Sequence, residues 1–382
     1  EKDGFNHIYV YDKNGKLKNQ VTKGNWEVTS YYGFDEKTST LFYQSTENGS
    51  INRAVYSIAL NGKNKRVLSN EIGTNEATLS PNFQYYINTF SSTTQPTRYT
   101  LNDAKSGKQL QIIEDNAALA SSLKKYDLPT KEFFVLKTAK GQELNSWIMK
   151  PKDFDATKKY PVFMYQYSGP GSQQVANQWN SANDYWFMML TQQGYVVACV
   201  DGRGTGFKGA DFKKVTQLQL GKYEVEDQID AAQVIGNYNY VDKSRIGIFG
   251  WSYGGFMASN CLFKGNDTFK MAIAVAPVTN WRFYDSIYTE RYMQTPQENA
   301  SGYDDNSPIN YVDRLKGKFL LIHGSGDDNV HVQNSMQMME ALIQANKQFD
   351  SQIYPDKNHG IYGGMTRIQL FNKMTNFMKE NL

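Results

Sequence analysis

The sequence has few of the residues that mark disulfide-rich, membrane-spanning or metal-binding proteins. It contains only two cysteines, Cys199 and Cys261, both in apolar segments, so we expect small buried hydrophobes and no disulfide framework. No run approaches the roughly 18 apolar residues of a membrane span. No group of His or Cys has the spacing of metal ligands, which predicts chemistry without a metal or organic cofactor.

Charge of one sign is also lacking. The 41 basic and 38 acidic residues give a net charge of +3 without long runs of like charge, so neither nucleic acid nor an anionic membrane is indicated as a partner. The first residues, EKDGFNHIYVY, lack the basic and apolar regions of a signal peptide, and the initial Glu suggests a processed or truncated product. A length of 382 residues with 40% hydrophobic residues predicts two domains with a substantial core.

Residues 1 to about 115 consist of short alternating runs such as HIYVYD, TLFYQS and YYINTF, a pattern typical of β-strands. Three similar turns recur, Asn14-Gly15-Lys16, Asn61-Gly62-Lys63 and Ser106-Gly107-Lys108, with their glycines 47 and then 45 residues apart. Asn-Gly favours a type I′ hairpin. A period of this length predicts the four-stranded blades of a β-propeller, and a plain β-meander is the alternative.

The propeller predicted by these repeats is incomplete. About two and a half repeats fit before the composition changes, whereas a closed propeller takes about four to eight blades. Unpaired strand edges would remain exposed. We therefore expect the chain to be the C-terminal part of a longer protein, or a fragment that stays associated with the missing N-terminal part of the propeller.

From about residue 116 the pattern changes to strands that alternate with helices. Helical spacing marks residues 223–238 and 334–347. The strand candidates are residues 161–167, 195–201, 245–250, 271–276, 318–324 and 351–355. Near-continuous apolar strands alternating with helices predict an α/β domain with a mostly parallel sheet covered on both faces. In such sheets the reactive residues gather at the carboxyl ends of the strands.

The segment IFGWSYGGF, residues 248–256, reads as a strand, a tight turn and a helix around Ser252. In this context G-x-S-x-G is the nucleophile elbow, whose glycines let strand and helix approach closely and leave the serine hydroxyl exposed. The alternative is an ordinary glycine-rich turn with a surface serine.

A serine nucleophile needs a base to take its proton. The chain has four histidines, and His359 fits best because PDKNHGIYGG is a turn-rich loop just past the last strand. His7 lies among the repeats, and we interpret His323 and His331 as a capped strand end and a side chain at a helix start.

The orienting acid is expected between nucleophile and base in the sequence. HGSGDDNVH provides Asp327 and Asp328 directly after a strand, and spacing does not separate the two. With either one, the order Ser252, aspartate, His359 is that of the α/β-hydrolases, so the residues predict a serine hydrolase.

The segments around these residues resemble the dipeptidyl peptidase IV branch of the prolyl oligopeptidase family. They occur in the family's order: YSGPGSQ (167–173), VDGRGTGFKG (200–209), GKYEVEDQIDAA (221–232), GWSYGGF (250–256), APVTNW (276–281), YDSIYTERYM (284–293), IHGSGDDNVH (322–331) and NHG (358–360). The resemblance implies an α/β-hydrolase catalytic domain over residues 118–382, preceded by the last blades of a propeller over residues 1–117.

Carried over to this sequence, the resemblance implies that Ser252 is the nucleophile, Asp327 the acid and His359 the base. It therefore chooses between the two aspartates. It also implies that the oxyanion is held by the backbone N–H of Tyr253 and by the hydroxyl of Tyr167. One such donor is typically worth about 10² to 10³ in rate.

The resemblance further implies a flat apolar pocket for proline with an amide beside it for the substrate carbonyl. The matching residues are Val278, Trp281, Tyr284, Tyr288 and Val330 for the pocket and Asn329 for the amide. Tyr284 and Tyr288 are four residues apart, which on a helix would place both rings on one face. Such a slot suits a pyrrolidine ring, which presents no N–H to satisfy.

The implied reaction is release of an N-terminal dipeptide with Pro or Ala second, through an acyl-enzyme. In the family a pair of adjacent glutamates holds the substrate amine, and this chain lacks a matching pair, since Glu224-Val225-Glu226-Asp227 matches a different segment. Family members are secreted, periplasmic or at the cell surface and pair through the hydrolase domain, which implies a homodimer.

Alternatives stay open at this point. A prolyl tripeptidyl peptidase or a post-proline endopeptidase would share the triad and the slot. A small-molecule esterase would use the triad alone, and a receptor-like relative without activity is disfavoured because all three triad residues are present.

Overall fold

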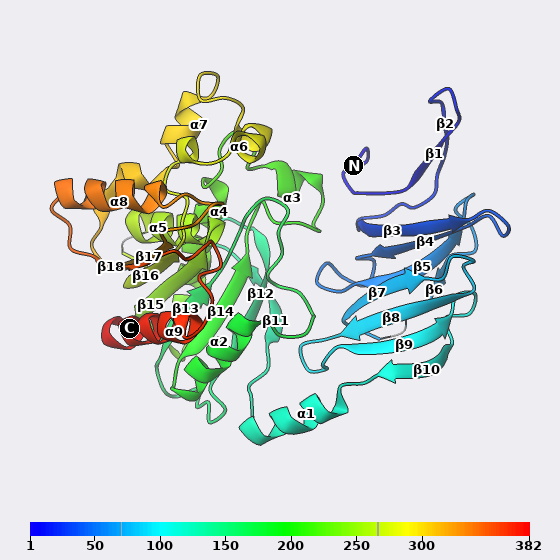
Figure 1. Ribbon diagram of the computed structural model, residues 1–382, viewed down its shortest axis with the longest axis horizontal. Coiled ribbons are helices and arrows are strands. Elements are labelled where there is room, and N and C mark those ends of the chain that lie inside the picture. Colours follow the sequence, from blue (N-terminus) through cyan, green and yellow to red (C-terminus); the bar gives the residue numbers. More distant parts are fainter. Residues whose placement is uncertain (70, 266) are drawn as a thin grey trace. The chain divides into compact units, whose positions relative to one another are not determined.

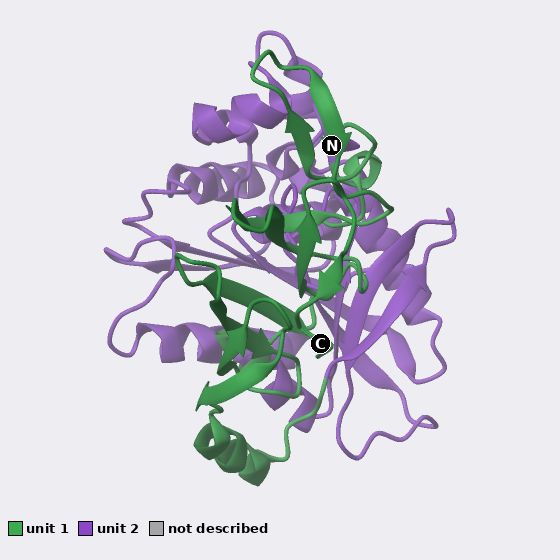
Figure 2. Cartoon of the chain, turned by 90° about the vertical axis from the view of Figure 1, so that its right-hand side faces the viewer, with its two compact units in different colours: residues 1–130, 176–185, 206–213 green, residues 131–175, 186–205, 214–382 purple. Residues whose placement is uncertain are grey.

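The computed structural model describes residues 1–69, 71–265 and 267–382 (Figure 1). They divide into two compact units, one made of residues 1–130, 176–185 and 206–213, the other of residues 131–175, 186–205 and 214–382 (Figure 2). Two short segments from the later part of the chain thus belong to the first unit. No helix in the described part of the chain has the length and apolarity needed to cross a membrane.

In the described residues of the first unit every sheet is antiparallel, as the alternating pattern predicts. β1 (Tyr9–Tyr11) and β2 (Leu17–Gln20) form a hairpin. Two four-stranded sheets follow. The first consists of β3 (Val28–Asp35), β4 (Thr40–Ser45), β5 (Ala54–Ala59) and β6 (Arg66–Val67). The second consists of β7 (Thr74–Leu79), β8 (Tyr85–Ser91), β9 (Arg98–Asp103) and β10 (Gln109–Glu114). The predicted propeller blades are confirmed, and the short α1 (Ala117–Leu123) and η1 (Lys124–Tyr126) come after them.

The three recurring turns each connect the outer strands of a repeat, and each has its glycine in the left-handed region. The φ angles of Gly15, Gly62 and Gly107 are 79°, 78° and 76°. The prediction of type I′ hairpins is wrong, because that turn needs positive φ at both central residues and Asn14 and Asn61 do not have it. The bond from the Ala59 N–H to the Lys63 carbonyl (3.0 Å) instead closes a longer loop in which only the glycine is left-handed.

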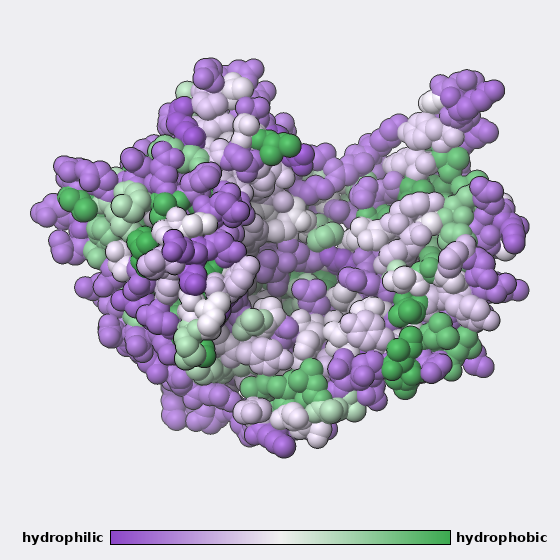
Figure 3. Space-filling model, viewed as in Figure 1, coloured by the Kyte–Doolittle hydropathy of each residue, from purple (hydrophilic) through white to green (hydrophobic). Residues whose placement is uncertain are grey.

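The two blades are covered differently. Residues of β4 and β5 are buried on both faces of their sheet, with Tyr43 and Tyr56 in its core. Every residue of β10, the edge strand of the second sheet, is exposed. Hydrophobic residues gather over the β8–β10 end of the first unit in Figure 3, where Leu110, Ile112 and Ile113 are exposed.

The second unit is built on one eight-stranded sheet with the strand order of an α/β-hydrolase, β11-β12-β14-β13-β15-β16-β17-β18. These strands are β11 (Glu132–Lys137), β12 (Glu143–Met149), β13 (Tyr160–Tyr165), β14 (Val196–Asp201), β15 (Val241–Trp251), β16 (Met271–Val275), β17 (Lys318–Gly324) and β18 (Asp350–Tyr354). From β14 to β18 the pairing is parallel, whereas β12 is antiparallel to both of its neighbours. The six predicted strands are confirmed, and the antiparallel pair β11–β12 was not predicted.

Helices alternate with most of these strands along the chain. They are α2 (Ala182–Gln192), α3 (Ala210–Lys214), α4 (Tyr223–Gly236), α5 (Tyr253–Lys264), α6 (Ser286–Met293), α7 (Ala300–Asp304), α8 (Gln333–Gln344) and α9 (Thr366–Asn381), with 3₁₀ turns η2 (Trp281–Phe283) and η3 (Pro308–Arg314). α5 packs on β15 and β16, and α9 packs on β16 and β17. Cys199 and Cys261 are buried, as expected. The carboxyl ends of β13, β15 and β17 share one edge of the sheet, where the site lies.

Candidate active site

Ser252 occupies a strained turn between β15 and α5. Its backbone has φ 61° and ψ −119°, a conformation that residues other than glycine rarely adopt. The flanking glycines are required by space: a Cβ on Gly250 would lie 2.1 Å from the Gly254 carbonyl oxygen, and one on Gly254 would lie 2.6 Å from the Gln166 carbonyl oxygen. The Ser252 N–H donates to the Val275 carbonyl (2.8 Å). The turn thus presents the hydroxyl in one fixed direction.

Asp327 and His359 form a hydrogen-bonded pair. Oδ2 of Asp327 lies 2.7 Å from Nδ1 of His359, and its Oδ1 accepts the N–H groups of Asn329 (3.0 Å) and Val330 (2.9 Å). Burial raises the pKa of Asp327, but hydrogen bonds from two histidines and the charge of His359 outweigh it and hold the pKa below its ordinary value. The carboxyl group is therefore an anion fixed at both oxygens. The adjacent Asp328 instead lines a pocket.

A tryptophan places the histidine loop beside the serine turn. Nε1 of Trp251 donates to the carbonyl oxygen of His359 (3.0 Å), and Trp251 directly precedes Ser252. Gly324, at the end of β17, lets the histidine loop approach this strand closely, because a Cβ on residue 324 would lie 2.2 Å from the Lys357 carbonyl oxygen. The structure thus brings the turn, the acid and the histidine loop to the same end of the sheet. Nδ1 of His359 faces Asp327, which leaves Nε2 to face a nucleophile.

Two hydrogen-bond donors lie near the serine hydroxyl. Burial raises the pKa of Tyr167, and interaction of its hydroxyl with the Ser252 side chain opposes the rise. Tyr253 is the first residue of α5, and the first N–H groups of a helix have no carbonyl partner within it. The tyrosine rings lie 6.1 Å apart. Both positions are where the sequence predicts oxyanion donors.

The aromatic residues predicted for the proline pocket cluster around Trp281. The Trp281 ring lies 5.4 Å from Tyr253, 5.9 Å from Tyr284 and 5.9 Å from Tyr288, centroid to centroid. Val278, Trp281 and Val330 are buried. The rings of Tyr284 and Tyr288 meet edge to face at 5.3 Å.

One prediction about this cluster is wrong. Tyr284 and Tyr288 do not share a helix, because α6 begins at Ser286 after Asp285, whose side chain accepts the Tyr288 N–H (2.8 Å) as a helix cap. Tyr284 is extended instead. The two rings meet because the chain turns at the Asp285 cap. The predicted contact between Tyr284 and Tyr288 therefore exists, but it does not come from helical spacing.

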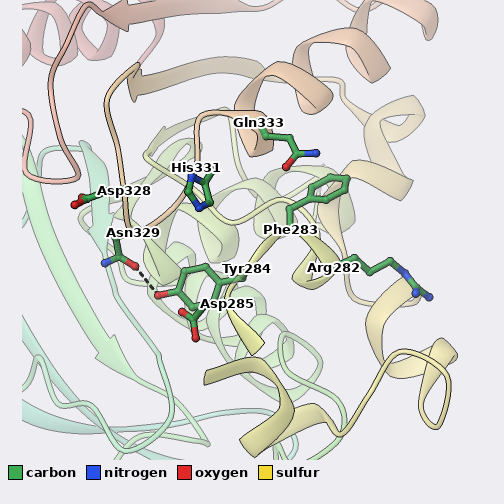
Figure 4. Close-up of a pocket in the computed structure, with 8 residues that line it drawn as sticks. All are labelled: Arg282, Phe283, Tyr284, Asp285, Asp328, Asn329, His331 and Gln333. Carbon is green, nitrogen blue, oxygen red and sulfur yellow. Dashed lines mark hydrogen bonds between the residues drawn. The ribbon is translucent and has the colours of Figure 1, made fainter. Parts of the chain in front are cut away.

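A cavity of about 540 Å³ adjoins the aromatic cluster (Figure 4). Its lining residues are Arg282, Phe283, Tyr284, Asp285, Asp328, Asn329, His331 and Gln333. The Tyr284 hydroxyl donates to Oδ1 of Asn329 (2.7 Å), which leaves the Asn329 amide N–H groups to face outward, as the close-up shows. The amide predicted to hold the substrate carbonyl thus stands at the edge of both the cluster and the cavity.

Two buried residues of this site were not identified from the sequence. His323, interpreted as a strand-end histidine, contacts Asp327, with Nε2 3.2 Å from Oδ2. Glu224, inside α4, accepts the hydroxyl of Tyr253 (2.7 Å). His323 obeys the rule that reactive residues gather at strand ends. Its position four residues before Asp327 was the feature of the sequence that could have indicated their contact.

Comparison with known proteins agrees with this geometry. The model of the Prolyl oligopeptidase family matches residues 181–382, and that of the Dipeptidyl peptidase IV N-terminal region matches residues 1–97. The crystal structure of Porphyromonas gingivalis dipeptidyl peptidase 4 superposes with a TM-score of 0.97 at 53% identity, over 100% of this chain and 54% of that chain.

A curated relative is also similar along nearly the whole chain. Dipeptidyl aminopeptidase B of Saccharomyces cerevisiae is 37% identical over 403 residues, which cover 99% of this chain and 49% of the relative. The chain thus spans about half the length of the proteins it matches.

Proposed function

Because the chain belongs to the prolyl oligopeptidase family, in its dipeptidyl peptidase IV branch, we propose that it carries the catalytic site of a serine exopeptidase. The enzyme would release N-terminal dipeptides with Pro, or less well Ala, in second place. The observation that carries the proposal is the 2.7 Å hydrogen bond between Asp327 and His359. The loop of His359 is in turn hydrogen-bonded to Trp251, the residue directly before Ser252. The domains would be residues 1–117 and 118–382.

The geometry supplies each group of an acyl transfer. Oγ of Ser252 would attack the carbonyl carbon of the second substrate residue while Nε2 of His359 takes its proton. Asp327 holds Nδ1 of His359 and stabilises the imidazolium. The Tyr253 N–H and the Tyr167 hydroxyl would receive the negative charge on the carbonyl oxygen. His359 then protonates the leaving amine as the C–N bond breaks, and water releases the dipeptide by the reverse route.

The aromatic cluster around Trp281 supports the preference for proline. Trp281, Tyr284 and Tyr288 enclose a rigid apolar site, and Asn329 stands beside it to hold the carbonyl of the first substrate residue. A pyrrolidine ring has few conformations to lose and presents no N–H to satisfy. Ala would fit the same site with less contact.

The substrate amine needs an anchor outside the acidic run of α4. Glu224 is buried against Tyr253, and Asp227 is paired with Arg203 through Nη2 at 2.7 Å, so neither faces a substrate. We place the anchor in the remaining part of the propeller, as a partner segment of the same protein. A homodimer and a secreted, periplasmic or cell-surface location complete the proposal.

The test compares release of a chromogenic leaving group from a Gly-Pro substrate with a free amine and from the same substrate acetylated at its amine. S252A is the blank. Cleavage of the free-amine form alone is expected. Equal cleavage of both forms would indicate an endopeptidase. Hydrolysis of a simple ester without cleavage of either amide would indicate an esterase, and both results would overturn the proposal.

A further inference from the structure

His323 is a fully buried histidine at the carboxyl end of β17, and both of its ring nitrogens have protein partners. Nδ1 lies 2.6 Å from the hydroxyl oxygen of Ser335 in α8, and Nε2 lies 2.7 Å from the carbonyl oxygen of Val330. Nε2 also lies 3.2 Å from Oδ2 of Asp327. One ring nitrogen thus faces the acid of the proposed triad and a wall of the proposed proline pocket.

The partners of Nε2 determine where the proton of His323 resides. A carbonyl oxygen and an ionised carboxylate can only accept hydrogen bonds. Nε2 must therefore carry a hydrogen, which it donates to the Val330 carbonyl, and the same nitrogen lies 3.2 Å from Oδ2 of Asp327. The Ser335 hydroxyl can donate to Nδ1 or accept from it, so this contact is compatible with either charge state of the ring.

The acceptor oxygen on Asp327 is the one that also binds His359. Two imidazoles therefore converge on Oδ2, at 3.2 Å from His323 and 2.7 Å from His359. Oδ1 is held separately by the N–H of Val330 (2.9 Å). Val330 is thus bound twice, through its N–H to Asp327 and through its carbonyl to His323, and the 3.2 Å contact between His323 and Asp327 completes a ring of three residues.

We propose that His323 is a positioning residue whose single Nε2–H fixes the Asp327 carboxylate toward His359 and Val330 in the wall of the proline pocket. Rate and selectivity for the second substrate residue then depend on the same buried N–H. The inference rests on the proposed function, because it assigns selectivity to the pocket that binds that residue.

The Nε2–H of His323 also reduces the negative charge that the Asp327 carboxylate presents to His359. A hydrogen bond to Oδ2 draws negative charge from that oxygen, so its loss leaves Asp327 more attractive to protonated His359. The negative charge of Asp327 also acts on Tyr284, but burial raises the pKa of this tyrosine to about 12, so it stays neutral in the working range.

The test compares H323N with H323Q in the full-length protein. The amide nitrogen of glutamine reaches the place of Nε2, whereas that of asparagine reaches only the place of Nδ1. H323N is expected to lower kcat/KM for the Gly-Pro substrate by about 10²-fold, because a misplaced general-base assembly typically costs that much. H323Q is expected to stay within about tenfold of the wild type.

Two further readouts separate positioning from mere stability. In H323N the acid limb of the kcat/KM profile is expected to move to higher pH, and the Gly-Pro over Gly-Ala preference to fall at least about fivefold. S335A, which removes only the partner of Nδ1, is expected to keep both. A slow H323N with the wild-type acid limb and preference would overturn the proposal.

Folding failure and failure of the proposed function are distinguishable from these results. If H323N does not fold, H323Q and S335A are expected to share the wild-type acid limb and preference, since both keep a donor at Nε2. A shift in both would assign the effect to the Ser335 contact and overturn the inference. If the wild type cleaves no Gly-Pro substrate, the proposed function fails. The acid limb of the pH profile for ester hydrolysis then still tests whether His323 positions the Asp327 carboxylate.

Discussion

Two buried carboxyl groups contact the residues around Ser252, and they differ in charge. Asp327 is 4% exposed and Glu224 is fully buried, so burial raises the pKa of both. Asp327 is bound by two imidazoles, and its pKa falls below the ordinary value. Glu224 has a tyrosine hydroxyl and the Gly221 N–H (3.1 Å), and its pKa rises to about 7. The comparison shows that the partner decides whether a buried carboxyl stays ionised.

The largest effect is expected from D327N, which removes the anion. Oδ1 must remain an acceptor for the N–H groups of Asn329 and Val330, so the amide nitrogen would replace Oδ2 and face His359. That arrangement forces the wrong tautomer on His359, and kcat is expected to fall by about 10⁴. Steady-state kinetics with D328N as the matched control, expected to lose less than about tenfold, checks this. A loss below about 10² in D327N would contradict the assignment of the acid.

The next effect concerns the pH dependence of stability. A folded pKa of about 7 for Glu224 against 4.5 in the unfolded chain means that its stabilising contribution is complete below about 4.5. It is lost as the pH rises through 7, on the order of 3 kcal/mol for a shift of this size. Asp327 has the opposite sign, since its contribution is present at neutral pH and is lost only in acid.

E224Q isolates this contribution, because glutamine matches the protonated acid. It can accept from the Gly221 N–H and donate to the Tyr253 oxygen. Denaturant unfolding between pH 5 and 8 is expected to show E224Q gaining on the wild type as the pH rises. A constant difference across that range would mean that Glu224 does not change its proton on unfolding.

The smallest effect is expected from Y253F, which removes one donor from Glu224 and leaves the backbone N–H in place. The free energy of unfolding is expected to fall by about 1 to 3 kcal/mol, the typical cost of an unsatisfied buried group. Because the proposed oxyanion donor is the backbone N–H of residue 253, kcat/KM is expected to stay within about fivefold. Thermal unfolding and kinetics of the same sample test both, and a loss like that of D327N would show that the hydroxyl acts in the reaction.

The main features of the fold could be read from the sequence because both of its patterns are local. Turn glycines such as Gly15 and Gly62 recur with the blades, and apolar runs mark the strands of the parallel sheet. The antiparallel pair β11–β12 was missed because three of the six β11 residues are exposed and polar residues interrupt the apolar ones in β12. Its place in the sheet depends on long-range pairing to β14, which no local pattern encodes.

Chain order and the position of strand ends were enough to propose Ser252 and His359 for the site. The two adjacent aspartates could not be separated by spacing, and in the structure Asp327 is the one that contacts His359. The contact of His323 with Asp327 is set by the turn after β17, which folds Val330 back over the histidine. That distance is decided by packing in three dimensions, so a strand-end histidine gives no sign of it.

The positive φ of Ser252 has a consequence for engineering this protein. A side chain in that conformation typically costs about 1 to 3 kcal/mol, and glycine would relieve most of it. A selection for heat resistance alone would therefore favour glycine at position 252, and with it a sturdier but inert protein. The proposed nucleophile is thus kept against a thermodynamic bias toward glycine, so any library screened for stability needs a parallel screen for turnover.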